Sequence, residues 1–230
     1  MTEQELRDQF VKSLGAYYGA EEGSQRHREL IDWYNRLSPL PRGYRMTYTA
    51  DWCVAAAVAI AVKLELTDIV FPECSCTKEI ELYNAAGRFT KDKHYRPQPG
   101  DFLIFDWNPG SGPDHWATVV RVTGSTIRTI EGNLGDKIWH RDVEIGDERI
   151  YGYCLPDYAG KAAKLTKPNR KFQDVPEGKW YTKPIEKAAE LGLMAGVSEA
   201  EFGLGQPVNR EELAAVAVRL YECLKPEQQE

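Results

Sequence analysis

With 230 residues, the chain is long enough for one large domain or two smaller ones. Its formal net charge of −6, and the lack of a basic tract with interleaved aromatic residues, argue against nucleic acid as a partner. The longest apolar run, residues 54–62, is far short of the roughly 20 residues that a membrane span requires. Nucleic-acid binding and membrane insertion are therefore not expected.

The first residues, 1–8, are charged and contain no apolar core, so we identify no secretory signal peptide. We expect a protein that is made in the cytoplasm and leaves by another route, or one whose leader has been removed.

The cysteine pattern argues against both a disulfide framework and a zinc site. An odd and sparse set is not typical of a disulfide scaffold. Cys74-Ser-Cys76 could supply two metal ligands, but no second Cys/His pair follows at a zinc-site spacing. We expect no metal and no cofactor, and interpret this pair as loop thiols or half of a fortuitous disulfide. The five cysteines are Cys53, Cys74, Cys76, Cys154 and Cys223.

Four helices are predicted in the first part of the chain. Residues 2–18 begin with a capping box, Thr2-x-x-Glu5, and carry apolar residues at helical spacing. A second helix is expected over residues 24–37, before Pro39 and Pro41. The Ala- and Val-rich stretch 49–63 predicts a third helix that ends near Leu66, and residues 77–86 predict a fourth.

From residue 97 the apolar period changes from that of helices to that of strands. A Gly124-Ser125 turn predicts that two of these strands form a hairpin. Helices followed by an antiparallel meander indicate an α+β domain that covers residues 1–158. The expected strands are residues 102–107, 115–122, 126–131, 137–143 and 149–155.

A linker and a second domain complete the chain. Residues 159–170 are rich in Lys, Ala, Pro and Thr without a periodic apolar pattern, so we interpret them as a linker. Residues 171–230 predict a small α-helical domain, with helices over 181–192 and 210–224. Asn209 is the expected N-cap of the last helix.

Cys53 lies in the first turn of the predicted third helix. Asp51 is a good N-cap there, and the free N–H groups and the positive end of the helix dipole favour a thiolate. A rigid buried helix would hold such a nucleophile well. A free cysteine on a core helix is also often a small buried hydrophobe. This stretch alone leaves both interpretations open.

His115 is the best candidate for the base that a cysteine nucleophile needs. It follows a Gly/Pro-rich loop and opens a Val-rich strand, a place where catalytic groups are often displayed. The alternative is a hydrogen-bonded histidine at a sheet edge. The other histidines are less suited: His27 is expected to be solvated on a charged helix, His94 lies in a loop, and His140 lies on a sheet surface.

The strand that pairs with the His115 strand ends in Glu131-Gly132-Asn133. If residues 119–122 and 127–130 form a hairpin, Glu131 returns close to the level of His115. Glu131 or Asn133 could then hold the second imidazole nitrogen and fix its tautomer. Both could also be ordinary polar residues at a strand end. Gly132 fits a sharp backbone turn.

These motifs occur in an order that resembles the CHAP family of cysteine- and histidine-dependent amidohydrolases/peptidases. They are Trp52-Cys53 on an Ala-rich helix, Pro99-Gly100-Asp101 before a strand, His115, and Glu131-Gly-Asn133. The resemblance covers about residues 32–157. It implies a papain-like fold and cleavage of an amide bond in peptidoglycan.

The resemblance also implies the roles of the site residues. Cys53 would be the nucleophile, His115 the general base, and Glu131 and Asn133 orienting or polarising groups. The Cys53 backbone N–H could supply one oxyanion donor. Some members carry an acidic calcium loop before the cysteine; residues 42–49 have no acidic cluster, so we expect no metal there.

Residues 172–223 are similar to a surface-layer homology (SLH) motif, which anchors proteins to secondary cell-wall polymers. The similarity implies that Arg210 contacts an acidic glycan, with Trp180 as a second candidate binding residue. Arg210 could instead pair with Glu211 or Glu212 on the helix surface. Trp180 and Phe202 could belong to the core of so small a domain.

The SLH-like motif is also unusual in number. Family members usually carry three such motifs and this chain has one, which could bind weakly, form a homo-oligomer, or have lost binding.

The combined hypothesis is a modular peptidoglycan hydrolase, an N-acetylmuramoyl-L-alanine amidase or peptide endopeptidase. A phage or prophage endolysin that is released through a holin pore fits the missing leader. Its partners would be peptidoglycan and a secondary wall polymer. The alternative is a non-catalytic wall-binding protein on the same scaffold, because the Asp51 carboxylate beside the thiol would oppose ionisation. Another papain-like hydrolase with an Asp-Cys motif is disfavoured by Trp52.

Overall fold

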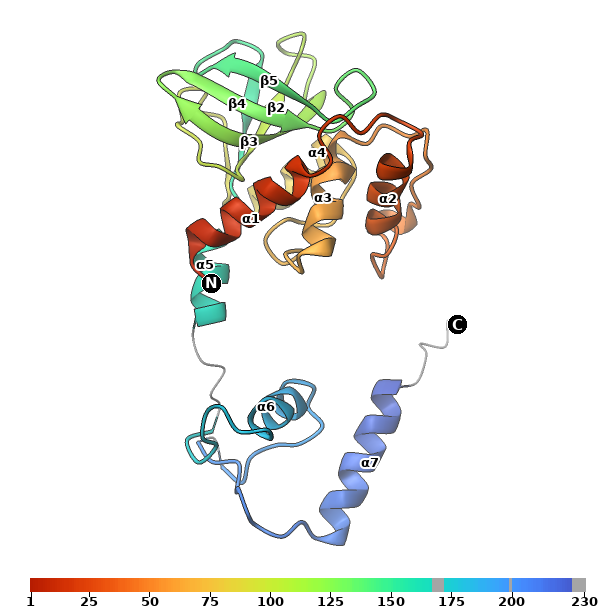
Figure 1. Ribbon diagram of the computed structural model, residues 1–230, viewed down its shortest axis with the longest axis vertical. Helices are drawn as coiled ribbons and strands as arrows, with labels where there is room; N and C mark the ends of the chain where they lie inside the picture. Colours follow the sequence, from red (N-terminus) through yellow and green to blue (C-terminus); the bar gives the residue numbers. More distant parts are fainter. Residues whose placement is uncertain (167–171, 199, 225–230) are drawn as a thin grey trace. The chain divides into compact units, whose positions relative to one another are not determined.

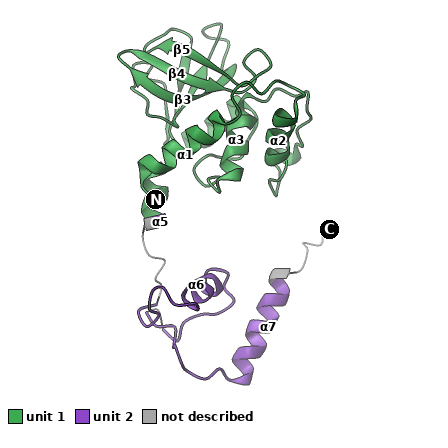
Figure 2. Ribbon diagram, viewed as in Figure 1, with its two compact units in different colours: residues 1–164 green, residues 165–230 purple. Residues whose placement is uncertain are grey.

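The chain forms two compact units in the computed structural model, residues 1–164 and 165–230 (Figure 2). The structure describes residues 1–166, 172–198 and 200–224. Among these residues, no helix combines the length and apolar character needed to cross a membrane. Each unit is described below by itself.

Unit 1 begins with helices whose ends follow from their capping residues. Helix α1 (Glu3–Gly15) has the expected capping box, because Thr2 and Glu5 exchange side-chain and backbone hydrogen bonds. Helix α2 (Gln25–Tyr34) is capped by the Ser24 hydroxyl. Helices α3 (Cys53–Lys63) and α4 (Cys76–Ala85) follow, after a short 3-10 turn at Pro41–Gly43. All four predicted helices are confirmed.

A six-stranded antiparallel sheet completes unit 1, with strand order β1-β6-β2-β3-β4-β5. The first four predicted strands form a meander as β2 to β5, but the last one does not continue it. Strand β6 instead pairs with β2, along the edge of β2 that faces away from β3. Strand β1, which was not predicted, pairs with β6. The strands are β1 (Phe89–Thr90), β2 (Phe102–Phe105), β3 (His115–Thr123), β4 (Thr126–Glu131), β5 (Trp139–Glu144) and β6 (Ile150–Cys154).

Helix α3 is the buried centre of the unit. Every residue from Val54 to Ala61 is buried, and the helix packs against α1, α2 and β3. Figure 1 shows α1, α2 and α3 gathered on one side of the sheet. The alanines let these neighbours approach closely, because they project no more than a methyl group. The first residue of α3 is thereby held in a fixed position beside the sheet.

The prediction of a linker over residues 159–170 is partly wrong. Helix α5 (Tyr158–Thr166) occupies its first half. Ala and Lys are good helix formers, and the buried Tyr158 anchors the helix, with its ring edge-to-face against Phe10 and under the Arg7 guanidinium. Residues 167–170 lie outside the described residues.

Unit 2 contains α6 (Thr182–Glu190), α7 (Arg210–Leu224) and a small core of Phe172, Val175 and Ile185, to which α6 contributes Ile185. The expected N-cap of α7 is confirmed: the Asn209 side chain accepts from the Glu212 N–H, and Glu212 accepts from the Asn209 N–H. The Asp174 carboxylate accepts three backbone N–H bonds, from residues 202–204, and so fixes the loop that leads towards α7.

Candidate active site

Cys53 is the first residue of α3, but the helix is capped differently from the prediction. The N-cap is Trp52, without a side-chain hydrogen bond. The expected cap, Asp51, is exposed, and its carboxylate accepts a hydrogen bond from Asn133 Nδ2 at 3.2 Å. The thiol therefore lies beside the unpaired N–H groups of the first turn without a carboxylate occupying them.

His115 and Glu131 form a buried pair at neighbouring strand ends. His115 opens β3, and Glu131 ends β4, which pairs with β3 through Thr118 opposite Ile130. The His115 Nε2 atom lies 3.0 Å from Glu131 Oε2. Of the two orienting groups that the sequence left open, Glu131 is thus the one that holds the imidazole. Asn133 is bonded to Asp51 instead.

Two further residues hold the Glu131 carboxylate, and the sequence analysis missed both. The Thr129 hydroxyl donates to Oε1 at 2.6 Å, and the Arg141 Nε lies 3.1 and 3.2 Å from the two carboxylate oxygens. The Arg141 guanidinium also stacks over the Trp107 ring at 4.7 Å. Thr129 and Arg141 face each other across β4 and β5, so the strand register would have revealed them.

The Cys53 thiol and the His115 imidazole shift each other's pKa in opposite directions. The pKa of Cys53 is lowered well below its ordinary value, first by a hydrogen bond with Cys76 and then by the hydrogen bond and charge of His115, against the opposing effect of burial. The Val54 N–H in the first turn of α3 lowers it further. Since Nε2 is bound to Glu131, Nδ1 is the ring nitrogen that remains for Cys53.

The protonated form of His115 is favoured in return. Burial alone would lower its pKa, but the hydrogen bonds to Cys53 and Glu131 raise the pKa of His115 to about 9. Burial would raise the pKa of Glu131, and this is outweighed by His115, Thr129 and Arg141, so the net shift is downward. The site thus favours a thiolate–imidazolium pair beside an ionised carboxylate.

Gly132 allows the end of β4 to touch α3. A Cβ atom at this position would lie 2.6 Å from the Ala56 Cβ and 3.1 Å from the Trp52 carbonyl oxygen. The sequence analysis attributed Gly132 to a sharp turn. The structure shows a second and more specific reason, which is the close approach of the strand end to the first helical turn that carries Cys53.

Residues 43–133 match the CHAP domain family, and this range contains Cys53, His115, Glu131 and Asn133. Residues 171–214 match the S-layer homology domain family. The chain contains a CHAP domain and an SLH domain. CHAP domains are cysteine-dependent peptidoglycan hydrolases, and SLH domains associate proteins with the cell wall. The matched CHAP range ends before β5, so Arg141 lies outside it.

Similar individual proteins share only parts of the chain. An endoglucanase of Bacillus sp. (strain KSM-635) is 42% identical over 48 residues, which are 21% of this chain and 5% of that protein. Two crystal structures of Ly7917, one of them with the hydrolysing product of MDP, are 13% and 15% identical, with TM-scores of 0.34 and 0.33. Each alignment covers 56% of this chain and 62% of the other.

Within the CHAP domain, Cys76, the second cysteine of the Cys74-Ser75-Cys76 motif, lies beside Cys53. Cys76 is the first residue of α4, and its Sγ lies 3.9 Å from the Cys53 Sγ. The motif therefore does not act as an isolated pair of loop thiols. Among the described residues, no group of three or more His, Cys, Asp or Glu side chains is arranged to hold a metal ion.

The structure tests the predictions for two further histidines, His27 and His140. His27, expected to be solvated, is buried, and its ring packs on Trp52 with centroids 4.6 Å apart. The prediction was wrong because the helix α2 turns this residue towards the N-cap of α3. His140 is half-buried on β5, where its Nδ1 contacts the Thr129 carbonyl oxygen at 2.7 Å.

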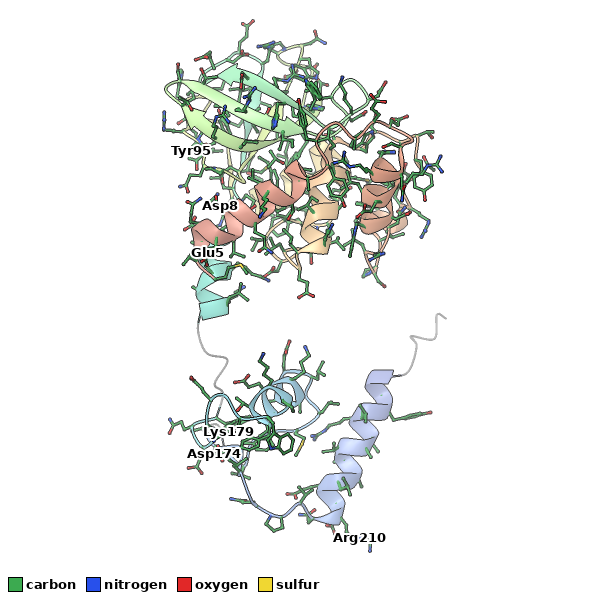
Figure 3. The ribbon with its side chains drawn as sticks, in the orientation of Figure 1. Glu5, Asp8, Tyr95, Asp174, Lys179 and Arg210 are labelled. Carbon is green, nitrogen blue, oxygen red and sulfur yellow. The ribbon has the colours of Figure 1, made fainter. Side chains whose placement is uncertain are left out.

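In the SLH domain the two candidate binding residues are exposed. Arg210 is the first residue of α7 (Figure 3). Within the described part of the chain it makes no ion pair with Glu211 or Glu212, and Glu212 instead caps the helix. Trp180 is 86% exposed, so it is not a core residue, whereas Phe202 packs against the small core. The core of this domain is complete without Trp180.

Proposed function

We propose that this chain hydrolyses an amide bond of peptidoglycan, with Cys53 as the nucleophile and His115 as the general base. The observation that carries the proposal is the buried His115, whose Nε2 is held 3.0 Å from Glu131 Oε2 and which lowers the pKa of the thiol at the start of α3. This is the arrangement of nucleophile, base and orienter that covalent acyl transfer requires. The CHAP match supports the same chemistry.

The reaction proceeds in two half-reactions. The Cys53 thiolate attacks the carbonyl carbon of the amide, and the His115 imidazolium gives its proton to the departing amine nitrogen as the C–N bond breaks. His115, now neutral, takes a proton from water, whose oxygen attacks the thioester carbon. The C–S bond then breaks, which releases the acid and restores the thiolate. The Cys53 backbone N–H can stabilise the oxyanion in each step.

Glu131 orients the imidazole and stabilises its charged form. Its contacts to Thr129 and Arg141 satisfy the rest of the buried carboxylate, so it remains ionised. Asn133 makes no hydrogen bond to His115 among the described residues, and its amide donates instead to the Asp51 carboxylate beside the α3 N-terminus. We infer that Asn133 shapes the site rather than orienting the base.

The SLH domain would attach the enzyme to a secondary cell-wall polymer through Arg210 and Trp180. An exposed guanidinium suits an acidic group of a glycan, and an exposed indole suits stacking on a sugar ring. A homo-oligomer through this domain would multiply a single weak site. The SLH match and the exposure of the two side chains support the attachment.

The cleaved bond is either the amide between the sugar and the peptide or one within the peptide. Mass spectrometry of digested walls separates the two: an amidase frees the lactyl carboxyl group and releases the whole stem peptide from the glycan, whereas an endopeptidase leaves part of the peptide on the glycan. A phage or prophage origin stays a prediction of the sequence analysis; neither the fold nor the matched domains bear on it.

The proposed function is tested with Cys53→Ala in the full chain. The variant should no longer clear a suspension of Gram-positive cell walls, while it still cosediments with those walls. Cys74→Ser serves as a matched control that removes a thiol outside the proposed machinery and should lyse normally. Lysis by Cys53→Ala at the wild-type rate would refute the proposal. Wall binding without lysis by the wild-type chain would favour the non-catalytic alternative.

A further inference from the structure

The two half-buried thiols Cys53 and Cys76 lie at the starts of different helices that meet. Cys53 begins α3 and Cys76 begins α4, and their sulfur atoms are 3.9 Å apart. A disulfide bond requires about 2.05 Å, so the two sulfurs need to approach by about 2 Å to form one. Each sulfur also lies at the positive end of a helix dipole.

The segment that carries Cys76 is held firmly in place. The buried Glu73 carboxylate pairs with the Arg42 guanidinium at 2.7 and 3.0 Å. The same carboxylate accepts the backbone N–H groups of Cys74 and Ser75 at 2.7 and 3.2 Å. Ser75 then caps α4. Cys76 is therefore presented to Cys53 by a fixed turn and not by a loose loop.

We propose that Cys53 and Cys76 are a peroxide-responsive pair that closes into a reversible disulfide. The Cys53 thiolate attacks one oxygen of hydrogen peroxide, the O–O bond breaks, and a sulfenic acid and hydroxide form. The Cys76 sulfur then attacks the Cys53 sulfur, the S–O bond breaks, and the departing hydroxide takes up the Cys76 proton as water. Each sulfur is oxidised by one electron equivalent, and the two peroxide oxygens are reduced.

The order of these steps follows from which thiol is ionised. Cys53 interacts with His115, and so it is the thiolate that meets the oxidant. The Cys53 thiolate raises the pKa of Cys76 and keeps Cys76 protonated. Conversion of Cys53 to a neutral sulfenic acid removes that anion and frees Cys76 to ionise and attack. Cys76 would thus act as a resolving thiol, as in other sensor pairs.

The disulfide itself does not depend on the proposed function, whereas its consequence does. If Cys53 is the nucleophile, the bond to Cys76 removes the thiolate and stops hydrolysis until a reductant restores it. It also protects Cys53 from irreversible oxidation to a sulfinic acid. Cys74, two residues away, contacts Arg42 and provides a matched control.

The test treats the full chain with several equivalents of hydrogen peroxide, because two are needed to take a thiol to a sulfinic acid, and maps its peptides without reduction. We expect a Cys53–Cys76 linked peptide in the wild type and in Cys74→Ser. Both should lose nearly all lysis and recover it with dithiothreitol. Cys76→Ser, checked for folding by circular dichroism, should instead accumulate sulfinic acid at Cys53 and fail to recover.

Other results would overturn the proposed disulfide or the proposed role of Cys53. Sulfinic acid at Cys53 in the wild type without the linked peptide would overturn the proposal, as would a Cys53–Cys74 link. A linked peptide with undiminished lysis would uphold the disulfide and refute the proposed role of Cys53. Because the peptide map of the wild type stands by itself, the test does not depend on whether the variant folds.

Discussion

His115 Nε2 lies 3.0 Å from Glu131 Oε2, and this contact directs the other ring nitrogen to Cys53. Both side chains are buried, so the imidazole has little freedom to turn away. The buried carboxylate favours the imidazolium, which in turn favours the thiolate. The charge states of Cys53, His115 and Glu131 therefore depend on the contact between His115 and Glu131 at the two strand ends.

Glu131→Gln should lower the lytic rate by roughly 100-fold, the lower end of what positioned acid–base catalysis contributes. It should also change the pH profile. The imidazolium pKa is raised to about 9 in the wild type, so activity is expected to fall above that pH. Loss of the carboxylate removes a cause of the raised pKa, and the alkaline limb should move to lower pH.

The measurement for this prediction is the pH dependence of lysis by wild type and variant. Glu144→Gln, on the neighbouring strand β5, replaces an exposed carboxylate and is the matched control. An alkaline limb that stays in place in Glu131→Gln would contradict the assignment of Glu131 as the group that holds the base.

Gly132→Ala should destabilise the CHAP domain by about 1–3 kcal/mol, the usual cost of overpacking. The added methyl would lie 2.6 Å from Ala56 Cβ, so β4 and α3 must move apart. Because that movement separates Glu131 from the turn that carries Cys53, lysis should fall at temperatures where the variant is still folded. Denaturant unfolding and initial lytic rates check both effects, and unchanged values of both would contradict the close approach.

Arg7→Met should destabilise the chain by about 3–5 kcal/mol, since it leaves a buried carboxylate unpaired. The Arg7 guanidinium lies 2.9 Å from Asp101, and it ties α1 to the turn before β2. Burial raises the pKa of Asp101, so the unpaired carboxylate is a cost at neutral pH that protonation relieves as the pH falls. The variant's deficit in unfolding free energy should shrink towards acid pH.

The control for Arg7→Met is Lys78→Met, which breaks the exposed pair with Glu81 and should cost no more than about 1 kcal/mol. The double variant Arg7→Met/Asp101→Asn should recover part of the loss. Equal costs for the buried and exposed pairs would show that the Arg7 contact does not secure α1.

Arg210→Ala should weaken wall binding about tenfold or more, because a charge-assisted hydrogen bond contributes roughly 1.5–3 kcal/mol. Trp180→Ala should weaken it as well. Hydrolysis of soluble peptidoglycan fragments should stay unchanged in both, since neither residue belongs to the CHAP domain. Cosedimentation with walls is the readout, and Lys183→Ala on the exposed surface of α6 is the matched control. Normal wall binding by both variants would exclude Arg210 and Trp180 as the residues that bind the wall polymer.

Local signals explain why much of the fold could be predicted. The caps Thr2 and Asn209 each fix a helix start, and each was predicted from the sequence. The prediction that Asp51 caps α3 was wrong. An N-cap preference cannot show that Asn133, from a distant strand end, donates a hydrogen bond to that carboxylate. The placement of β6 beside β2 was missed for the same reason, since it depends on long-range pairing.

The candidate site shows the same division between local and distant information. Cys53 and His115 stand at element starts, where sequence patterns are informative. Cys76 reaches Cys53 only because two helix starts 23 residues apart converge. Arg141 reaches Glu131 through the register of β4 and β5. Trp180 was weighed as a core residue because it is aromatic, yet Phe172, Val175 and Ile185 fill that core.

The most direct test of the account is the pH dependence of Cys53 alkylation, followed peptide by peptide in the full chain. The account predicts an apparent thiol pKa well below the ordinary value of about 8.5, and a clear rise in that pKa in His115→Ala. A Cys53 that titrates near the ordinary value, and does so equally with and without the imidazole, would contradict it.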